Sequence, residues 1–267
     1  MFILLVKIIA TTVFVLGFSI LAERCSPRLA GILMGAPLGA LISYFFIGQE
    51  AGPEYVVAST PFATAGMTGT LMFTYAYYRT SVWCSDWPPH WNTFSAALIG
   101  VTVYLAFITI ISGFAFNIIG ALILVIPAIF LGTFIFRKIG DLTISVPTQL
   151  TLKLLFIRAS GAALLVTLIS SLAASLGSVW GGLLMAFPMT LLPTMIIIHL
   201  TYSKEHVHAL LSAFPVGLGS VVVYIVVVGE TFSRFGIAGG TISALTAAWA
   251  YLILLPIGFK ISRYIRH

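Results

Sequence analysis

Apolar runs about twenty residues long follow one another along almost the entire chain, separated by short stretches that hold the charged and turn-forming residues. A run of that length crosses the hydrocarbon core of a bilayer as an α-helix. Only 7% of the 267 residues are charged, against roughly 25% in soluble domains. The sequence therefore predicts an all-α polytopic membrane protein, and it excludes a soluble catalytic domain, a nucleic-acid-binding module and a disulfide scaffold.

The apolar runs divide into about nine predicted transmembrane helices. The first run is expected to remain as a helix, because it lacks the charged start and the small-residue exit of a cleaved signal. The approximate bounds are Phe2–Ala22, Leu29–Gly48, Tyr55–Tyr78, Asn92–Phe114, Ile118–Phe136, Leu152–Leu176, Val179–Leu200, Val207–Val228 and Phe235–Phe259.

The basic residues predict the orientation in a cytoplasmic (inner) membrane. With the N-terminus outside and the C-terminus cytoplasmic, ten basic residues fall on the cytoplasmic side and only Arg234 falls outside. The net charge of +6 then reports topology rather than an affinity for polyanions. The ten are Arg24, Arg28, Arg79, Arg137, Lys138, Lys153, Lys204, Lys260, Arg263 and Arg266.

A shift of 151 residues aligns 7–78 with 158–229 without a gap, and fourteen positions are identical. The centre of the match is G-x-L-M-x-x-P, which runs from Gly31 to Pro37 and again from Gly182 to Pro188. Outside that motif, Glu54 matches Glu205. A shared motif and a shared carboxylate at one offset indicate an internal repeat rather than similarity of composition alone.

Five predicted helices separate equivalent positions, and this odd number places the second copy in the membrane upside down. The predicted organisation is repeat A over 1–115, a linking helix and cytoplasmic loop over 116–149, and the inverted repeat B over 150–267. Inverted repeats are typical of secondary transporters, whose binding sites lie at broken helices near the middle of the membrane. Channels and some lipid-handling proteins also have inverted halves.

Pro37 and Pro188 are predicted near the middle of equivalent helices, where a proline removes one backbone hydrogen bond and frees a carbonyl. Together with the neighbouring Met34 and Met185, they are the candidate residues of a central substrate site. The alternative is a plain kink, in which the glycines of the motif serve close helix packing.

Lys7 and Arg158 are the two basic residues that fall inside predicted spans, at equivalent positions of the repeat. A cation costs about 2.5–3.5 kcal/mol at the centre of a membrane helix on insertion scales, so such residues usually face a cavity or a partner. The pair therefore indicates an anionic substrate. The alternative is that each side chain snorkels to the nearer interface.

Glu54, Glu205 and His206 are candidate gating or proton-carrying residues. Each glutamate opens a predicted helix, where the helix dipole already favours a carboxylate, so a purely structural role is the alternative. His206 lies between His199 and His208 around a short turn. This arrangement is typical of solvated residues at the membrane interface, although histidine also titrates near neutral pH and can carry protons.

Metal, cofactor and catalytic motifs are absent from the sequence. His206 and His208 are two residues apart and point in different directions on a helix, which is a poor spacing for metal ligands. Cys25 and Cys84 are both predicted on the reducing cytoplasmic side. We expect no enzyme activity, no metal and no cofactor.

The expected function is secondary transport of a small solute, which Lys7 and Arg158 indicate to be anionic, and coupling to a proton or a sodium ion is left open. The lipid bilayer and the solute are the expected partners, nucleic acid is not, and a homo-oligomer is left open. The alternatives are a passive channel and a non-enzymatic role in envelope assembly or lipid handling.

We predict that replacing Lys7 and Arg158 by alanine depresses solute flux when both changes are combined, because the substrate would lose a cation on each side of the membrane centre. Uptake into liposomes across a panel of anions measures this. Wild-type flux in the double variant would remove both residues from the mechanism.

Overall fold

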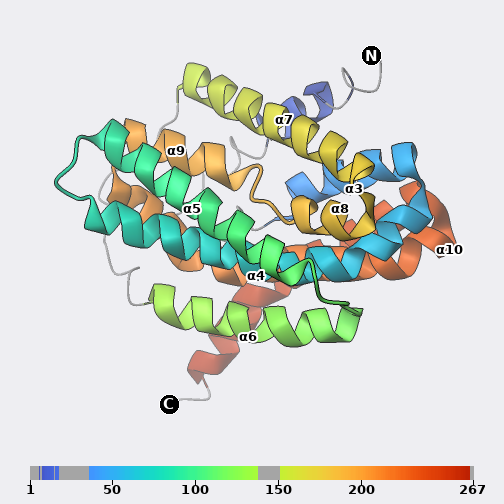
Figure 1. Ribbon diagram of the computed structural model, residues 1–267. Coiled ribbons are helices and arrows are strands. Elements are labelled where there is room, and N and C mark those ends of the chain that lie inside the picture. The colour runs from blue at the N-terminus through green and yellow to red at the C-terminus, as the bar shows by residue number, and fades with distance from the viewer. Residues whose placement is uncertain (1–5, 7, 15, 18–35, 138–150, 265–267) are drawn as a thin grey trace.

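The computed structural model describes residues 6, 8–14, 16–17, 36–137 and 151–264, and every regular element in these ranges is a helix (Figure 1). The prediction of an all-α fold is therefore confirmed for this part of the chain. The predicted first span is helical at its described positions. The motif residues 31–35 lie outside the described ranges.

Helices α4, α5, α6 and α7 follow their predicted runs closely, and the other predicted spans differ from the structure at three places. The long helix α10 contains two helices that meet at Gly236, whose φ of 69° is a conformation that favours glycine. The bounds are α3 Leu38–Ala51, α4 Pro53–Trp83, α5 Pro89–Ile111, α6 Ile118–Arg137, α7 Leu152–Ser175, α8 Gly177–Met185, α9 Leu191–Thr201 and α10 Lys204–Tyr264.

The three differences all concern where a helix is interrupted. The predicted span over 179–200 is two helices, α8 and α9, because the chain leaves helical geometry at 186–190 around Pro188. Of the predicted span over 29–48, the described part is helical from Leu38, where α3 begins after a bend at Ala36 and Pro37. The prediction of a turn between 228 and 235 is wrong, since the helix continues as far as Gly236.

Four helical segments among the described residues are long and apolar enough to cross a membrane: Pro89–Ile111, Ile118–Phe136, Lys153–Ser175 and Lys204–Leu255. This supports an integral membrane protein. Helix α4 is long but less apolar, because it carries glycines and many Ser and Thr side chains. Helices α8 and α9 are short because the break at 186–190 divides them, and α3 is short because it ends at Ala51, before α4.

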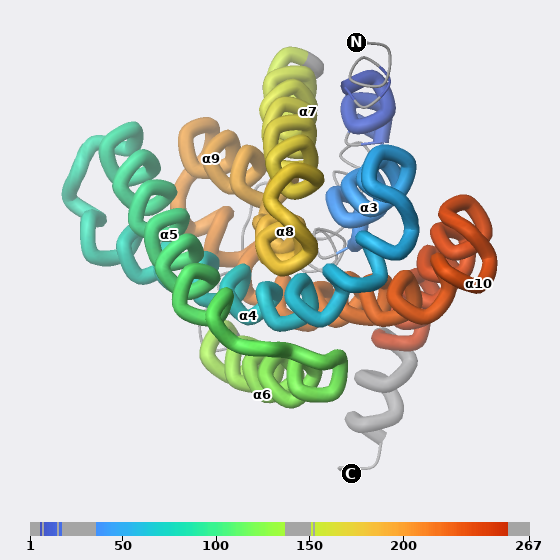
Figure 2. The backbone as a smooth tube through the Cα atoms, turned by 45° about the vertical axis from the view of Figure 1, so that its right-hand side comes forward, coloured from blue at the N-terminus to red at the C-terminus, as the bar shows by residue number. Residues whose placement is uncertain are grey.

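Helix α4 lies at the centre of the fold and packs against α3, α5, α6, α8 and α10 (Figure 2). Its small residues allow this crowding, which is how membrane helices commonly approach one another. Gly66 faces Ala186 and the backbone of Leu183, and Gly182 of α8 lies against the backbone of Ser59 and Ala63. By contrast, α5, α6 and α7 expose large apolar side chains, among them Leu105, Ile110, Ile123, Phe130, Phe134, Leu164 and Leu168.

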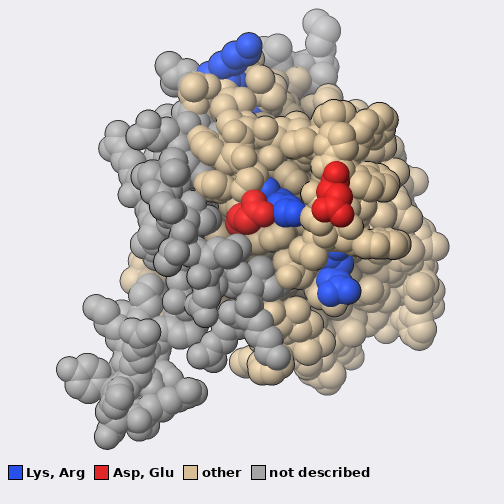
Figure 3. Space-filling model, turned by 90° about the vertical axis from the view of Figure 1, so that its left-hand side faces the viewer, with Lys and Arg blue, Asp and Glu red and all other residues tan. Residues whose placement is uncertain are grey.

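The charged helix ends separate into two groups at opposite ends of the bundle. The end of α4 with Arg79, the start of α7 with Lys153 and the start of α10 with Lys204 share one end, at the left of Figure 1. Figure 3 shows basic and acidic side chains gathered on that end. Glu54 and Glu230 lie toward the other end. The separation agrees with the predicted topology, and the side that each end faces stays a prediction.

We predict that Gly182→Ala lowers the thermal stability of the purified protein, because the new methyl group would overlap the Ser59 carbonyl oxygen and push α8 away from α4. The expected loss is about 1–3 kcal/mol. Thermal unfolding in detergent measures it. Gly132→Ala in α6 is the matched control, since its methyl group meets Pro215 at an ordinary 3.4 Å; equal losses in both variants would contradict the explanation.

Candidate functional site

The break between α8 and α9 is a tight turn centred on Pro188. The Met189 N–H donates to the Phe187 carbonyl across the proline at 2.7 Å, and the Leu192 N–H donates to the Pro188 carbonyl at 2.9 Å as α9 begins. Proline fits this position because it has no N–H that a continuous helix would need to pair. The helix is therefore broken at Pro188 rather than only kinked, while Gly182 of the motif packs closely against α4, as the alternative expected. The role of Pro188 in a substrate site stays a prediction.

The chain makes the same turn at Pro37. The Leu38 N–H donates to the Ala36 carbonyl at 2.8 Å, and the Leu41 N–H donates to the Pro37 carbonyl at 2.7 Å. Each donor and each acceptor lies 151 positions before its counterpart at Pro188. The two turns therefore have the same backbone hydrogen bonds, in the register in which the sequence aligns with itself.

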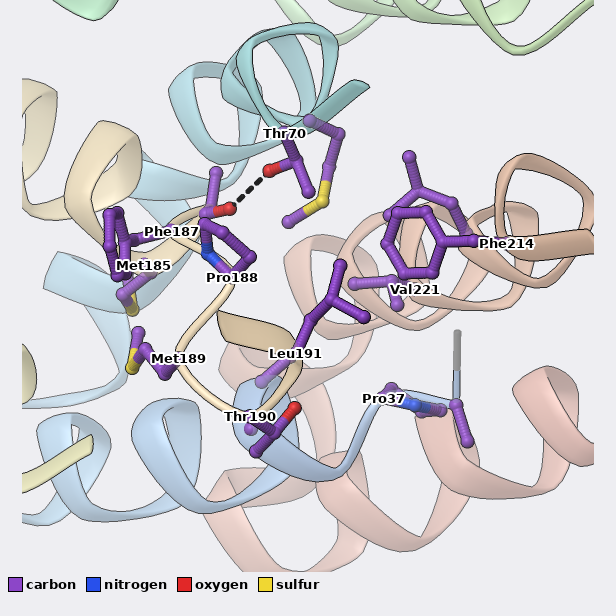
Figure 4. A pocket seen from close by; sticks show the side chains of 16 residues that line it. Pro37, Thr70, Met185, Phe187, Pro188, Met189, Thr190, Leu191, Phe214 and Val221 are labelled. Carbon is purple, nitrogen blue, oxygen red and sulfur yellow. Dashed lines mark hydrogen bonds between the residues drawn. The ribbon is translucent and has the colours of Figure 1, made fainter. Parts of the chain in front are cut away.

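The carbonyls at the end of α8 lose their helical partners at the break, and side chains from neighbouring helices replace these partners. The Tyr104 hydroxyl of α5 donates to the Leu183 carbonyl at 2.5 Å. The Thr70 hydroxyl of α4 donates to the Ala186 carbonyl at 2.5 Å (Figure 4). An unpaired carbonyl is costly in an apolar interior, so these two hydroxyls make the break tolerable there.

A pocket with a volume of about 50 Å³ lies between the two breaks, and α4 and α10 complete its wall (Figure 4). Twelve of its sixteen lining residues form six pairs whose members are 151 positions apart. The pairs are Ala36 with Phe187, Pro37 with Pro188, Gly39 with Thr190, Ala40 with Leu191, Met67 with Leu218, and Thr70 with Val221.

The lining of the pocket is uncharged. Its polar side chains are those of Thr70 and Thr190, and the thioethers of Met67, Met185 and Met189 supply soft, polarisable surface. A volume of about 50 Å³ holds a few water molecules. In this conformation the pocket is too small for a metabolite of ordinary size.

The structure brings Pro37, Pro188 and Met185 together around the pocket, as the candidate substrate site requires. Lys7 and Met34 lie outside the described residues. Arg158 lies on α7 with 5% of its surface exposed, and it is not part of the pocket lining. Among the described residues, the pocket therefore has no cation of its own for an anionic substrate.

The three candidate gating residues lie away from the pocket. Glu54 is exposed at the start of α4, where the Ser233 hydroxyl donates to its Oε1 at 3.3 Å. Glu205 and His206 are half-buried in the first turn of α10, and His206 Nδ1 lies 3.0 Å from the Ser203 hydroxyl. The two glutamates thus occupy opposite ends of the bundle.

Burial of two histidines differs from the sequence-based expectation of solvated interfacial residues. His199 and His208 are 4% and 5% exposed. Tyr77 and Ser81 of α4 provide their hydrogen-bond partners, and neither side chain stood out in the sequence. The available signal was the group of aromatic and hydroxyl side chains at 77–81, but the alignment of the sequence with itself does not place this group beside 199–208.

Within the described ranges, the structure contains no group of three or more His, Cys, Asp or Glu side chains that could hold a metal ion. Comparison with protein families, with curated proteins and with solved structures finds no match to this chain. The breaks and the pocket are therefore the features of the molecule that bear on its function.

We predict that Thr70→Val lowers thermal stability by about 1–3 kcal/mol, because the Ala186 carbonyl would remain buried without its hydroxyl donor. The measurement is thermal unfolding in detergent. Thr74→Val is the matched control, since Thr74 lies one turn further along α4 and its hydroxyl donates only to the Leu71 carbonyl of the same helix. If both variants lose the same stability, Thr70 has no special role at the break.

Proposed function

We propose that this protein is a secondary transporter that carries a small solute through the pocket between its two proline breaks. The observation that carries the proposal is the pairing of the pocket lining at a spacing of 151 residues. A site built from equivalent residues of two repeats, at two broken helices, is the arrangement found where inverted-repeat transporters bind their substrates.

The packing of α4 against α10 supports inversion of the two halves. The equivalent segments 53–83 and 204–234 lie side by side and antiparallel. Ser233 reaches Glu54 at the start of α4, and His208 reaches Ser81 near its end. Two copies related by inversion in the membrane plane are expected to place equivalent helices in opposite directions.

Alternating access follows from such an arrangement. Two halves with the same fold can exchange conformations, and the exchange moves the opening from one side of the membrane to the other. The small volume of the pocket means that a solute enters only after α4 and α10 separate at one end. The helix ends that meet on either side of the pocket are therefore the gates.

The chemistry of the lining favours a small solute with an apolar part and one or two hydrogen-bonding groups. The thioethers and aliphatic side chains match the apolar part, and the threonines supply the polar contacts. The anionic solute expected from Lys7 and Arg158 stays a prediction. In that case, these cations act along the path rather than in the pocket.

We predict that the protein catalyses solute uptake into liposomes driven by a pH or sodium gradient, and that Gly39→Leu abolishes it. The Cβ of residue 39 lies 3.5 Å from Thr190, so a leucine there fills the space between the two breaks. Flux of labelled solutes, with apolar-containing compounds and anions in one panel, measures this.

Ala106→Leu on the exposed face of α5 is the matched control and should transport normally. Absence of gradient-driven flux for every solute would contradict the proposal. Passive conductance in planar bilayers without coupling would favour a channel.

A further inference from the structure

The end of the bundle that carries the basic residues is closed by buried polar contacts between the two halves. His199 Nδ1 of α9 lies 2.9 Å from the Tyr77 hydroxyl of α4. His208 Nε2 of α10 lies 2.8 Å from the Ser81 hydroxyl of α4. The ring of His208 also packs edge-on against Tyr78, with centroids 4.7 Å apart. We refer to His199, Tyr77, His208 and Ser81 as the latch.

Hydrogen bonds from the Asn92 side chain and to backbone carbonyls hold the α4 residues of the latch in place. The Asn92 amide of α5 donates to the carbonyls of Ser81 and Cys84, at 3.0 Å and 2.7 Å. The Ser81 hydroxyl donates to the Tyr78 carbonyl at 2.8 Å. Because a hydroxyl has a single hydrogen, the Ser81 oxygen then accepts from His208 Nε2–H.

In the contact between His199 and Tyr77 the hydrogen bond runs in the opposite direction, so that the histidine is the acceptor. His199 Nδ1 is the partner that the structure shows for the single hydrogen of the Tyr77 hydroxyl. A neutral imidazole with its proton on Nε2 accepts such a bond at Nδ1, whereas a protonated imidazole has two donors and no acceptor. Protonation of His199 therefore removes the acceptor, while protonation of His208 leaves its Nε2–H donor in place.

Two charged groups act on these histidines electrostatically. Burial opposes a positive charge on His199 and His208 most strongly, Glu205 favours it, and Lys204 opposes it. The two histidines also oppose each other's charge. From α4 the facing titratable groups are Tyr77 and Tyr78, and α5 contributes the neutral amide of Asn92. Glu205 is thus the counter-charge available to one added proton.

The opposite end of the bundle has no such contacts at the corresponding positions. The residues 151 positions from the latch are Gly48, Val57, Val228 and Phe232, which have no titratable side chains. Close packing joins the halves there instead, with Gly48 against Ile237 and Gly229 against Thr60. Among the described residues, the buried histidine contacts between the two halves therefore lie at the basic end, whereas the carboxylates of Glu54 and Glu230 at the other end are exposed.

We propose that the latch is a proton-binding site, with His199 as the residue that takes the proton, and that protonation separates α4 from α9 and α10 at this end. The inference rests on the proposed transport function, for which it supplies the proton-coupled gate. It assigns the proton to His199 rather than to His206, with Glu205 as the counter-charge.

The test measures the separation of the two halves directly and needs no solute. Spin labels are attached to full-length protein with Val82→Cys and Leu200→Cys, two positions beside the latch that are 43% and 51% exposed. The native cysteines are replaced by Cys25→Ser and Cys84→Ser. Pulsed electron resonance in lipid nanodiscs then records the distance between labels from about pH 8 to about pH 3, a range that extends below the ordinary titration of histidine because burial opposes the charge on His199.

We expect the distance between the two labels to lengthen on acidification in the background protein, which carries only these four cysteine and serine changes. His199→Asn should remove the acid response, because its amide oxygen still accepts from Tyr77 but does not bind a proton. Tyr77→Phe should lengthen the distance already at neutral pH, which keeps the test decisive if the asparagine variant fails to fold. His206→Asn is the matched control and should respond as the background does.

A distance independent of pH in the background protein would overturn the proposal. So would an acid response that survives His199→Asn or disappears in His206→Asn. Labels at the other end, on Phe114→Cys and Phe235→Cys, should not move apart on acidification. If the latch opens on acidification but no solute flux is found, this inference stands and the proposed function is contradicted. If solute flux is found but the latch does not open on acidification, the proposed function stands and this inference is contradicted.

Discussion

The fold depends on how backbone carbonyls are satisfied where its helices break. Inside a membrane no water replaces a lost hydrogen bond, so an interrupted helix is tolerated only where other groups supply donors. Here Thr70 and Tyr104, from two different helices, donate to carbonyls at the end of α8. Because both donors must lie within hydrogen-bonding distance, they fix α4 and α5 against the break and thereby shape the pocket wall.

Helix α4 can take this central position because of its composition. Its glycines let α8 and α5 approach the backbone, and its hydroxyl side chains bond to carbonyls of its own helix or of its neighbours. Such a helix is less apolar than those around it, since it contacts protein rather than lipid. The apolar faces of α5, α6 and α7 form the outer surface.

The segments around Pro37 and Pro188 are similar, whereas the two ends of the bundle differ. The backbone hydrogen bonds at the two prolines correspond at a spacing of 151 residues. At the basic end, histidine, tyrosine and serine join α4 to α9 and α10, whereas the equivalent positions hold Gly or apolar residues.

The sequence by itself determined the helical class, the approximate bounds of most helices and the importance of Pro37 and Pro188, because apolar run lengths and proline chemistry are local properties. Of the substrate-site candidates taken from the sequence, Pro37, Pro188 and Met185 line the pocket. The tertiary structure alone decided that Arg158 lies outside the pocket lining and that His199 and His208 are buried. These depend on which helix faces cross at 77–81 and 199–208, and contacts between segments more than one hundred residues apart leave no periodic signal in the chain.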